Sequence, residues 1–349
     1  MDSLMLQRPE FPALSPLREL KRLRLENIDG LTEMILPEIC KGGALEELTV
    51  SGRQLETFGN LASIVVQNPL LQDLSARMVP ASCLSDVLTA GPQLKSVRLQ
   101  LCQFCHVPDD DTDAHTHSVL CSLPSPFQHE SLTVLDIAHA KFTSKAVNCL
   151  CNSFPNLSRL KFAHCSFEAA PAGKPLPQLR ELSFSLCDAP GSAVAGLLSS
   201  PLLETLKIKS SEMSPMPGGL SALYFLASPS LHQLSLYCSG TVASTATLKH
   251  VFEKNPNITE LSFGLTDTYE SSALIMSAVA TLANLRMLIL GPSFSISDLT
   301  AYGFLRMEME SKTGALLPAV KAKALAANED VFDLYKDSLL NFSKIVVIH

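Results

Sequence analysis

The sequence predicts a right-handed α/β solenoid shaped like a horseshoe, with a parallel sheet on its concave face and helices on its convex face. Two observations predict this fold class. A short apolar motif recurs about every 25 residues, and helical segments that end at a proline fill many of the intervals between motifs. Strand and helix patterns that alternate at such a period are typical of parallel sheets built from repeats.

The apolar motif has the form LxxLxL with mostly aliphatic residues at its apolar positions, and eleven copies occur. Nine of the ten intervals between copies span 22 to 28 residues, and the interval from Leu94 to Leu132 spans 38. Because strand side chains alternate between two faces, each motif predicts a strand with one buried face. The copies start at Leu20, Leu45, Leu71, Leu94, Leu132, Leu157, Leu179, Leu203, Leu231, Ile258 and Leu285.

Six of the predicted helical segments stop at a proline shortly before the next motif. Proline disfavours helical geometry in the residue before it and donates no backbone hydrogen bond, so it ends a helix. One repeat of about 25 residues buries too few apolar side chains to offset its own ordering entropy, so the repeats are expected to stack. The six prolines are Pro69, Pro92, Pro155, Pro201, Pro229 and Pro256.

The composition is that of a folded protein with a large core. Of the 349 residues, 46% are hydrophobic and 17% are charged, which argues against a disordered chain. The net charge of −7 argues against general nucleic-acid binding, and no apolar run is long enough to cross a membrane. The N-terminus does not read as a secretion signal, so a cytoplasmic or nuclear location is expected, with the ten cysteines as thiols.

Several copies carry cysteine at the ninth position, counting the first residue of the motif as position one. Cys102, Cys165 and Cys187 hold this position, where the common leucine-rich repeat has Asn or Cys. The chain therefore resembles the leucine-rich-repeat superfamily, in its helix-backed class seen in ribonuclease inhibitor and in the repeat domains of F-box receptor proteins. The resemblance covers roughly residues 17–292 and implies that the ninth side chain lies inside the turn after the strand. Other copies differ there, with Arg53, Val79, Ala140, Ser211 and Thr266.

The repeats divide the chain into three predicted parts. Residues 1–16 form a lead-in, residues 17–297 form the repeat domain, and residues 298–349 form a helical C-terminal cap. The cap is expected to contain helices near 298–311, 315–327 and 329–342 and a final strand in the segment KIVVIH. Its simplest role is to cover the last repeat, and the alternative is a docking helix for a partner.

The long interval holds an insertion near residues 103–130 that is rich in cysteine and histidine. Cys102 and Cys105 have the spacing of a zinc knuckle, and the same letters with His106 match the haem-attachment pattern CxxCH. The other interpretation is a solvated loop, because Cys102 is also the ninth residue of its repeat. We predict no metal ligand and no cofactor here, and zinc binding stays an open alternative. The further possible ligands are His115, His117, Cys121 and His129.

Positions two, three, five, seven and eight of each repeat are expected to face solvent on the concave side. They carry twelve cations and eight acids, so this face is mildly basic on a chain whose net charge is −7. The cations are Lys21, Arg22, Arg24, Arg77, Lys95, Arg98, Arg159, Lys161, Arg180, Lys207, Lys209 and Arg286. The acids are Glu26, Glu46, Glu47, Asp73, Asp136, Glu181, Glu204 and Glu260.

Part of this face is predicted to contact a partner protein that has an acidic surface. The alternative is ordinary solvation, in which cross-strand pairs such as Asp136 with Lys161 neutralise one another. Histidines and one tyrosine add possible contacts among the middle repeats. The predicted partner-binding residues are Arg98, Asp136, His139, Arg159, Lys161, His164, Lys207, Lys209 and Tyr237.

These features predict a protein-interaction scaffold that is not an enzyme. The chain has no GxxxxGK[ST], HExxH or GxSxG motif, and we expect a protein partner rather than nucleic acid or a membrane. The resemblance to F-box receptors suggests substrate recognition in a ubiquitin ligase as an alternative. About nineteen residues precede the first repeat, so no F-box is expected there. A second alternative is a regulator similar to the leucine-rich-repeat activators of small GTPases.

Overall fold

The structure is a computed structural model of the chain, and it forms two compact units, Met1–Leu176 and Pro177–His349, which we call the N-unit and the C-unit. The predicted lead-in 1–16 lies outside the described residues. The structure describes residues 19–28, 35–40, 43–52, 60–101, 120, 123, 126–168, 174–209, 219–238, 245–265, 272–291, 302, 305, 307, 310–311, 320–324 and 345–347.

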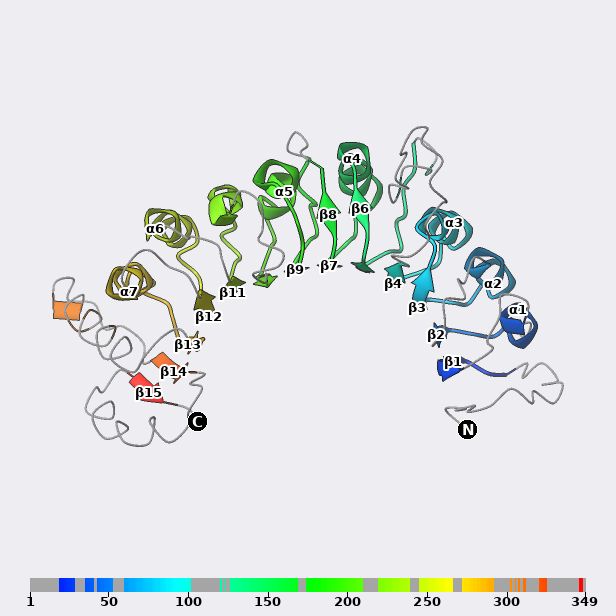
Figure 1. Cartoon of the computed structure of the whole chain (residues 1–349), viewed down its shortest axis with the longest axis horizontal. Helices are drawn as coiled ribbons and strands as arrows, with labels where there is room; N and C mark the ends of the chain where they lie inside the picture. Colours follow the sequence, from blue (N-terminus) through cyan, green and yellow to red (C-terminus); the bar gives the residue numbers. More distant parts are fainter. Residues whose placement is uncertain are drawn as a thin grey trace, which may run out of the picture. The chain divides into compact units, whose positions relative to one another are not determined.

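In the N-unit, parallel strands lie side by side in chain order, and helices lie on one side of them (Figure 1). The strands are β1 (Arg22–Ile28), β2 (Glu47–Gly52), β3 (Asp73–Val79), β4 (Ser96–Leu101), β5 (Val134–Ala138) and β7 (Arg159–Ala163). The helices are α1 (Ile35–Ile39), α2 (Leu61–Gln67), α3 (Cys83–Ala90) and α4 (Ser144–Ser153). A second, small parallel sheet pairs β6 (Lys141–Phe142) with β8 (Ser166–Phe167).

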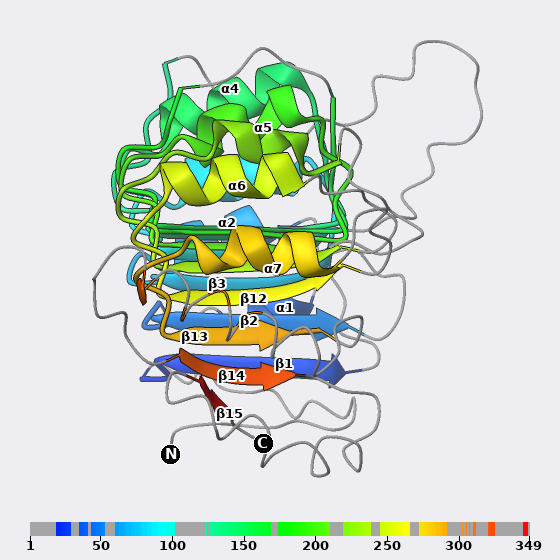
Figure 2. The same ribbon diagram turned by 90° about the vertical axis from the view of Figure 1, so that its left-hand side faces the viewer.

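The C-unit repeats this arrangement. Its strands are β9 (Glu181–Ser185), β10 (Thr205–Lys209), β11 (Gln233–Cys238), β12 (Glu260–Leu265), β13 (Met287–Leu290), β14 (Val320–Ala324) and β15 (Ile345–Val347). Its helical segments are α5 (Gly191–Leu198), the 3₁₀ helix η1 (Gly219–Phe225), α6 (Thr245–Lys254) and α7 (Ser272–Ala280). Figure 2 shows the strands edge-on, running in parallel beneath the helices. Both units are thus segments of a leucine-rich solenoid.

The fourth motif position forms the central row of the core in each unit. In the N-unit, the register joins Leu23, Leu48, Leu74, Val97, Leu135 and Leu160 as neighbours on successive strands. In the C-unit, it joins Leu182, Leu206, Leu234, Leu261 and Leu288. Every one of these side chains is at most 3% exposed. The predicted stacking of repeats is therefore confirmed within each unit.

The positions between these apolar residues point away from the helices. Burial alternates along the strands, as in β5 and β7, where positions four and six are buried and positions three, five and seven are not. We call this side of each sheet its open face. It corresponds to the predicted concave side, and the predicted contact residues lie on it.

The helices end close to the predicted prolines, with one difference in type. Residues 61–67, 83–90, 144–153, 191–198 and 245–254 are α-helical and each stops just before its proline. The segment before Pro229, which we predicted as an ordinary helix, forms the 3₁₀ helix η1. Gly219 is its first residue, and glycine lowers α-helix stability, which favours a shorter, tighter turn.

A buried polar side chain three residues before the motif links neighbouring repeats in the N-unit. Asn68 is fully buried, and its Nδ2 donates to the carbonyl oxygens of Cys40 at 3.0 Å and Ile64 at 2.8 Å. His129 holds the same place in a later repeat, where its Nε2 donates to the Gly91 carbonyl at 2.9 Å. Each of these bonds satisfies backbone groups left over at a helix end.

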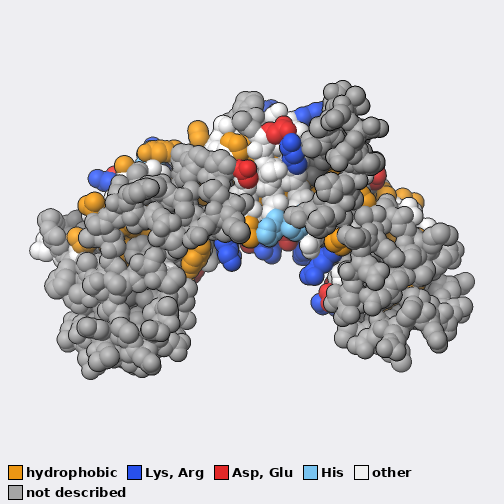
Figure 3. Space-filling model, in the orientation of Figure 1, with side chains coloured by type: hydrophobic (Ala, Val, Ile, Leu, Met, Phe, Trp, Pro, Cys, Tyr) orange, Lys and Arg blue, Asp and Glu red, His pale blue; other side chains and the backbone are white. Residues whose placement is uncertain are grey.

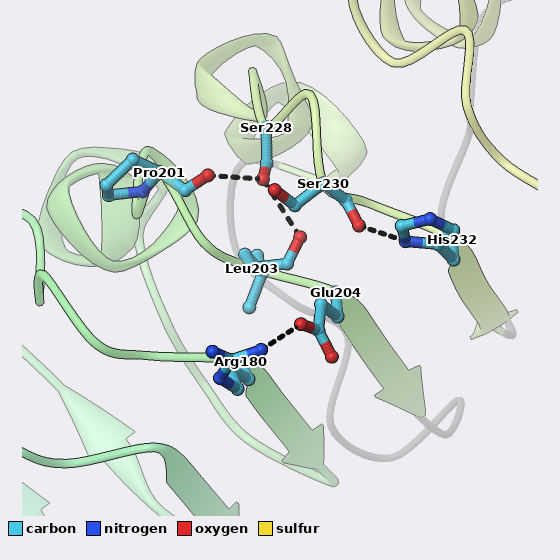
Figure 4. A network of polar contacts seen from close by, with 7 residues as sticks. All are labelled: Arg180, Pro201, Leu203, Glu204, Ser228, Ser230 and His232. Atoms are coloured by element: carbon cyan, nitrogen blue, oxygen red, sulfur yellow. Dashed lines mark hydrogen bonds and ion pairs between the residues drawn. The ribbon is translucent and has the colours of Figure 1, made fainter.

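The C-unit uses the same device. Asn255 is fully buried and donates from Nδ2 to the Leu226 carbonyl at 3.1 Å, while its Oδ1 accepts from the Ser228 amide at 2.9 Å. Figure 4 shows the Ser228 hydroxyl between the carbonyl oxygens of Pro201 and Leu203, at 3.2 Å and 2.9 Å. Bonds of this kind, rather than apolar contact alone, fix the position of one repeat on the next.

Two of the three ninth-position cysteines, Cys165 and Cys187, behave as the resemblance implied, and Cys102 lies outside the described residues. Cys165 is 2% exposed, and its Sγ donates to the carbonyl oxygens of Ala163 at 3.4 Å and Ile137 at 3.5 Å. Cys187 is equally buried, and its Sγ donates to the Ser185 carbonyl at 3.4 Å. The free thiols among the described residues include Cys40, Cys83, Cys149, Cys151, Cys165 and Cys187.

The predicted helix over 315–327 is wrong at Val320–Ala324, which form β14. The segment reads VKAKA, so apolar and cationic residues alternate with the period of a strand. Alanine and lysine favour a helix intrinsically, but β14 pairs with β13. This pairing satisfies backbone hydrogen-bonding groups on the exposed edge of β13. The final strand is confirmed as β15, and the predicted helix 329–342 lies outside the described residues.

Among the described residues, no helix is long and apolar enough to cross a membrane.

Candidate functional site

Six of the nine predicted contact residues lie in the N-unit, on or just after strands β4, β5 and β7. The register places Arg98 beside Asp136, and Asp136 beside Lys161, so these three form one row at position five. Arg159 lies at position three of β7, beside Val134. The structure therefore brings together cations that are far apart in the sequence.

Asp136 is the centre of this row. Its Oδ2 lies 3.5 Å from Nε of Arg98 on one side, and its Oδ1 lies 4.0 Å from Nε of Arg159 on the other. The Asp136 side chain is 22% exposed, whereas those of Arg98 and Arg159 are 44% and 36% exposed. The carboxylate thus lies at ion-pair distance from two guanidinium groups, whose side chains are partly exposed.

His139 and His164 follow β5 and β7 at position eight and form a stacked pair. Their ring centroids are 4.7 Å apart and the rings are 13° from parallel, a separation close to the usual spacing of neighbouring strands. Both residues have left-handed backbone, with φ of 59° and 52°. Met78 and Leu186 share this backbone at the same position, so it belongs to the repeat turn and is no special feature of the histidines.

The surroundings of His139 favour its neutral form. Burial lowers the pKa of His139, and the charge of the neighbouring His164 lowers it further. The backbone amide of His139 donates to the Ala163 carbonyl at 2.8 Å, which fixes the pair to both strands. Figure 3 shows histidine surface in pale blue close to lysine and arginine surface in blue.

Many other charges of the open faces are already paired across strands. In the N-unit, Lys21 and Glu46 are 2.8 Å apart and Arg22 and Glu47 are 3.6 Å apart. The bond from Lys21 and its charge lower the pKa of Glu46. This pairing is what the solvation alternative expects, and exposed pairs of this kind add little to stability.

In the C-unit, the predicted residues Lys207, Lys209 and Tyr237 occupy neighbouring strands. Lys207 Nζ lies 3.8 Å from Glu181 Oε1, and Lys209 is exposed beside Tyr237. Nearby, Figure 4 shows Arg180 paired with Glu204 and the His232 ring bonded to the Ser230 carbonyl. His232 therefore lies on the open side but is engaged with its own turn.

Tyr237 lies over a glycine on the next strand. A Cβ atom on Gly264 would come within 2.8 Å of the Tyr237 Cδ1 atom, so only glycine leaves room for the ring in this position. Gly291, next along, would meet the Gly264 Cα atom at 2.8 Å. The sequence analysis selected Tyr237 but not these two glycines. All three residues hold position seven of their repeats, and this shared position could have indicated that they are neighbours.

The possible metal ligands of the insertion fall mostly outside the described residues. Cys102, Cys105, His115, His117 and Cys121 lie there, so the zinc alternative stays a prediction. His129 is described and is 2% exposed, with the carbonyl partner reported above. It belongs to the repeat rather than to a metal site. Within the described part of the chain, no group of three or more His, Cys, Asp or Glu residues is arranged to hold a metal ion.

The comparisons with known proteins agree with this geometry. A family model described as "FBD-associated F-box protein At5g56370, LRR repeats" matches residues 143–336, which is more than half of the chain. The chain belongs to this leucine-rich-repeat family. The predicted resemblance and the predicted fold class are both confirmed. A search of curated proteins found no match.

Leucine-rich repeats generally mediate protein–protein interaction. The family match begins close to the start of α4 and continues through the C-unit to the region of β14. It therefore includes β7 with Arg159, Lys161 and His164, while β4 and β5 of the candidate surface lie before it.

Proposed function

We propose that this leucine-rich-repeat protein is a non-catalytic scaffold whose N-unit binds an acidic surface of another protein. The binding residues are Arg98, Arg159 and Lys161, with Asp136 as the group that orients the two arginines. The stacked pair of His139 and His164 borders the same surface.

The observation that supports this proposal is the in-register row on β4, β5 and β7. Arg98 and Arg159 pair with Asp136 in this part of the open face, and Lys161 is the strand neighbour of Asp136, so three cations gather here on a chain whose net charge is −7. Complementary charge speeds association and excludes wrong partners, and arginine is favoured at the centres of protein interfaces. Arginines held by a carboxylate also lose less side-chain entropy when a partner binds.

The test is affinity capture from cell lysate with quantification of every bound protein. We expect Arg159→Glu combined with Lys161→Glu to remove specific partners by tenfold or more, because both cations become repulsive to an acidic surface. Lys145→Glu is the matched control, since Lys145 is exposed on α4 in the same unit but on the helix side. If both variants capture the same partners as the wild type, the proposed binding surface is wrong.

A second candidate function is substrate recognition in a ubiquitin ligase. It is favoured by the family description, which names an F-box protein. In this case the partner captured on the N-unit would be a substrate whose cellular lifetime depends on the repeats. A longer cellular lifetime of such a partner when Arg159→Glu/Lys161→Glu replaces the wild type would support a role in degradation. An unchanged lifetime would mean that the protein binds the partner without promoting its degradation.

A further inference from the structure

The two stacked histidines of the N-unit have unequal surroundings. His139 is partly buried after β5, whereas His164 is exposed after β7. Their ring centroids are only 4.7 Å apart, and the hydrogen bond from the His139 amide to the Ala163 carbonyl joins the two turns. A charge on one ring therefore lies next to the other ring, so the two imidazoles titrate as a pair rather than as separate groups.

The stacked arrangement favours one proton over two. Exposure favours the charged form of an imidazole, so the exposed His164 takes up the first proton. Burial lowers the pKa of His139, and the charge of His164 lowers it further, because two charged rings at this distance repel each other. The free chain therefore keeps His139 neutral while His164 is charged.

The other charged or titratable side chains around the pair differ from it in kind. On β4 to β8, on α4 and directly after β7 and β8, they are carboxyl, ammonium, guanidinium and thiol groups. Of all these types, only imidazole ordinarily titrates between pH 5.5 and 7.5, so a change of charge in this range comes from the pair. The side chains are Arg98, Asp136, Lys141, Lys145, Cys149, Cys151, Arg159, Lys161, Cys165 and Glu168.

We propose that the histidine pair makes partner binding by the N-unit depend on pH, with His139 taking up a proton when the acidic surface of the partner binds. This inference rests on the proposed function, because it assigns the regulation of that same surface. The scaffold then binds its partner more tightly as the pH falls through the histidine range.

The pair lies close enough to the charged row for one partner to cover both. His139 and His164 follow Asp136 and Lys161 by three positions each, which is about 10 Å along a strand. A standard interface covers about 800 Å² on each partner, so a protein bound on the row also extends over the pair. Negative charge on that protein stabilises the charged form of His139 and offsets the repulsion from His164.

Proton uptake fixes the direction and the size of the pH dependence. The pKa of His139 is higher in the bound chain than in the free chain, so affinity begins to rise as the pH falls through the bound value and levels off below the free value. Uptake of one proton limits this rise to about tenfold per pH unit, whereas uptake of two protons would allow about a hundredfold. Because the two rings repel each other when both are charged, we expect no more than one.

The test measures the affinity of the full chain for poly-L-aspartate, as the acidic probe, from pH 7.5 to 5.5 at constant ionic strength. We expect the wild-type affinity to rise about threefold to tenfold per pH unit. The double variant His139→Asn/His164→Asn should change less than twofold over the whole range, and asparagine tolerates the left-handed backbone of both positions. His250→Asn is the matched control, since His250 lies on α6 of the C-unit, and it should keep the wild-type pH dependence.

The single variant His164→Asn tests the coupling within the pair. NMR of the carbon-bound imidazole protons in the free chain should show a raised pKa of His139, because the neighbouring charge is gone while the burial remains. A purely structural role of the stack would not move this pKa upward.

Three results would overturn the inference: an unchanged pKa of His139 in His164→Asn, equal pH dependence in the double variant and the wild type, or no binding of poly-L-aspartate. Loss of partners from lysate in Arg159→Glu/Lys161→Glu would still uphold the proposed function in each of these cases.

Discussion

The N-unit and the C-unit have nearly the same buried face and very different open faces. Position four is Leu or Val in every repeat from β1 to β13, whereas position seven runs from Arg77 through Ala138 and Ala163 to Tyr237 and Gly264. The buried positions are constrained by a neighbour on each side, because each repeat completes the core of the next. The open positions are free of that constraint, so they are where the two units can differ in what they bind.

The largest expected effect comes from the buried face, and it should be equal in the two units. Phe162 in the N-unit and Phe263 in the C-unit both lie at position six and are 1% and 0% exposed. Truncation of either to alanine should lower the free energy of unfolding by about 4 kcal/mol, since a buried aromatic is replaced by a cavity. Urea unfolding of the two variants measures this directly.

Unequal costs would show that the two cores are not equivalent. Phe162 has edge contacts with Phe142 and Phe167, at centroid distances of 5.1 Å and 5.0 Å. If this cluster adds stability of its own, Phe162→Ala should be the more costly variant by about 1 kcal/mol.

The next effect concerns the polar links between repeats in the C-unit. Asn255→Ala should cost about 3 kcal/mol, because it leaves the Ser228 amide and the Leu226 carbonyl buried without this partner. Asn257→Ala is the matched control, since its Nδ2 donates to the Pro229 carbonyl at 2.8 Å but the side chain is exposed. That control should cost less than about 1 kcal/mol. Similar costs in thermal or urea unfolding would contradict a special role for the buried link.

The corresponding link in the N-unit should make stability depend on pH. Burial lowers the pKa of His129 in the folded chain, so the unfolded chain binds the proton more readily. The stability contributed by neutral His129 is complete above the ordinary histidine pKa of about 6.5 and is lost as pH falls below it. His129→Gln keeps a donor for the Gly91 carbonyl without titrating.

The measurement is the midpoint of urea unfolding from pH 7.5 to 5.5. We expect the midpoint of the wild type to fall with pH more steeply than that of His129→Gln. His139→Asn should also reduce the pH dependence, because the pKa of His139 is lowered in the folded chain as well. Its effect should be smaller than that of His129→Gln, because His139 is less buried than His129. A His129→Gln curve as steep as that of the wild type would assign the pH dependence to other groups.

The sequence predicts the buried face well and the chemistry of the open face only in outline. The motif placed Leu48 beside Leu74 correctly, because the register of stacked repeats follows from the period itself. It could not predict that Asp136 pairs with Arg98 and Arg159, since this depends on side-chain rotamers across three strands. For the same reason, the sequence could not predict that the rings of His139 and His164 stack.

Two errors have a common cause. His129 was grouped with the insertion because its neighbours in the sequence are cysteines and histidines, yet its distance from the next motif is that of Asn68 and Asn255. Residues 320–324 were read as helix from their composition, although the exposed edge of β13 favours a strand there. In both cases the position within the repeat was more informative than the local residue types.

The smallest expected effect tests whether the open face of the C-unit has its own fixed arrangement. Gly264→Ala should cost about 1 kcal/mol, because its new Cβ would lie 2.8 Å from Cδ1 of Tyr237 and push the ring off the sheet. In a Tyr237→Ala background the same change should cost almost nothing, so a double-mutant cycle of unfolding free energies measures the contact. Gly291→Ala is the control, since it meets the Gly264 backbone and should cost the same in either background. Equal costs of Gly264→Ala in both backgrounds would mean that the tyrosine does not rest on the glycine.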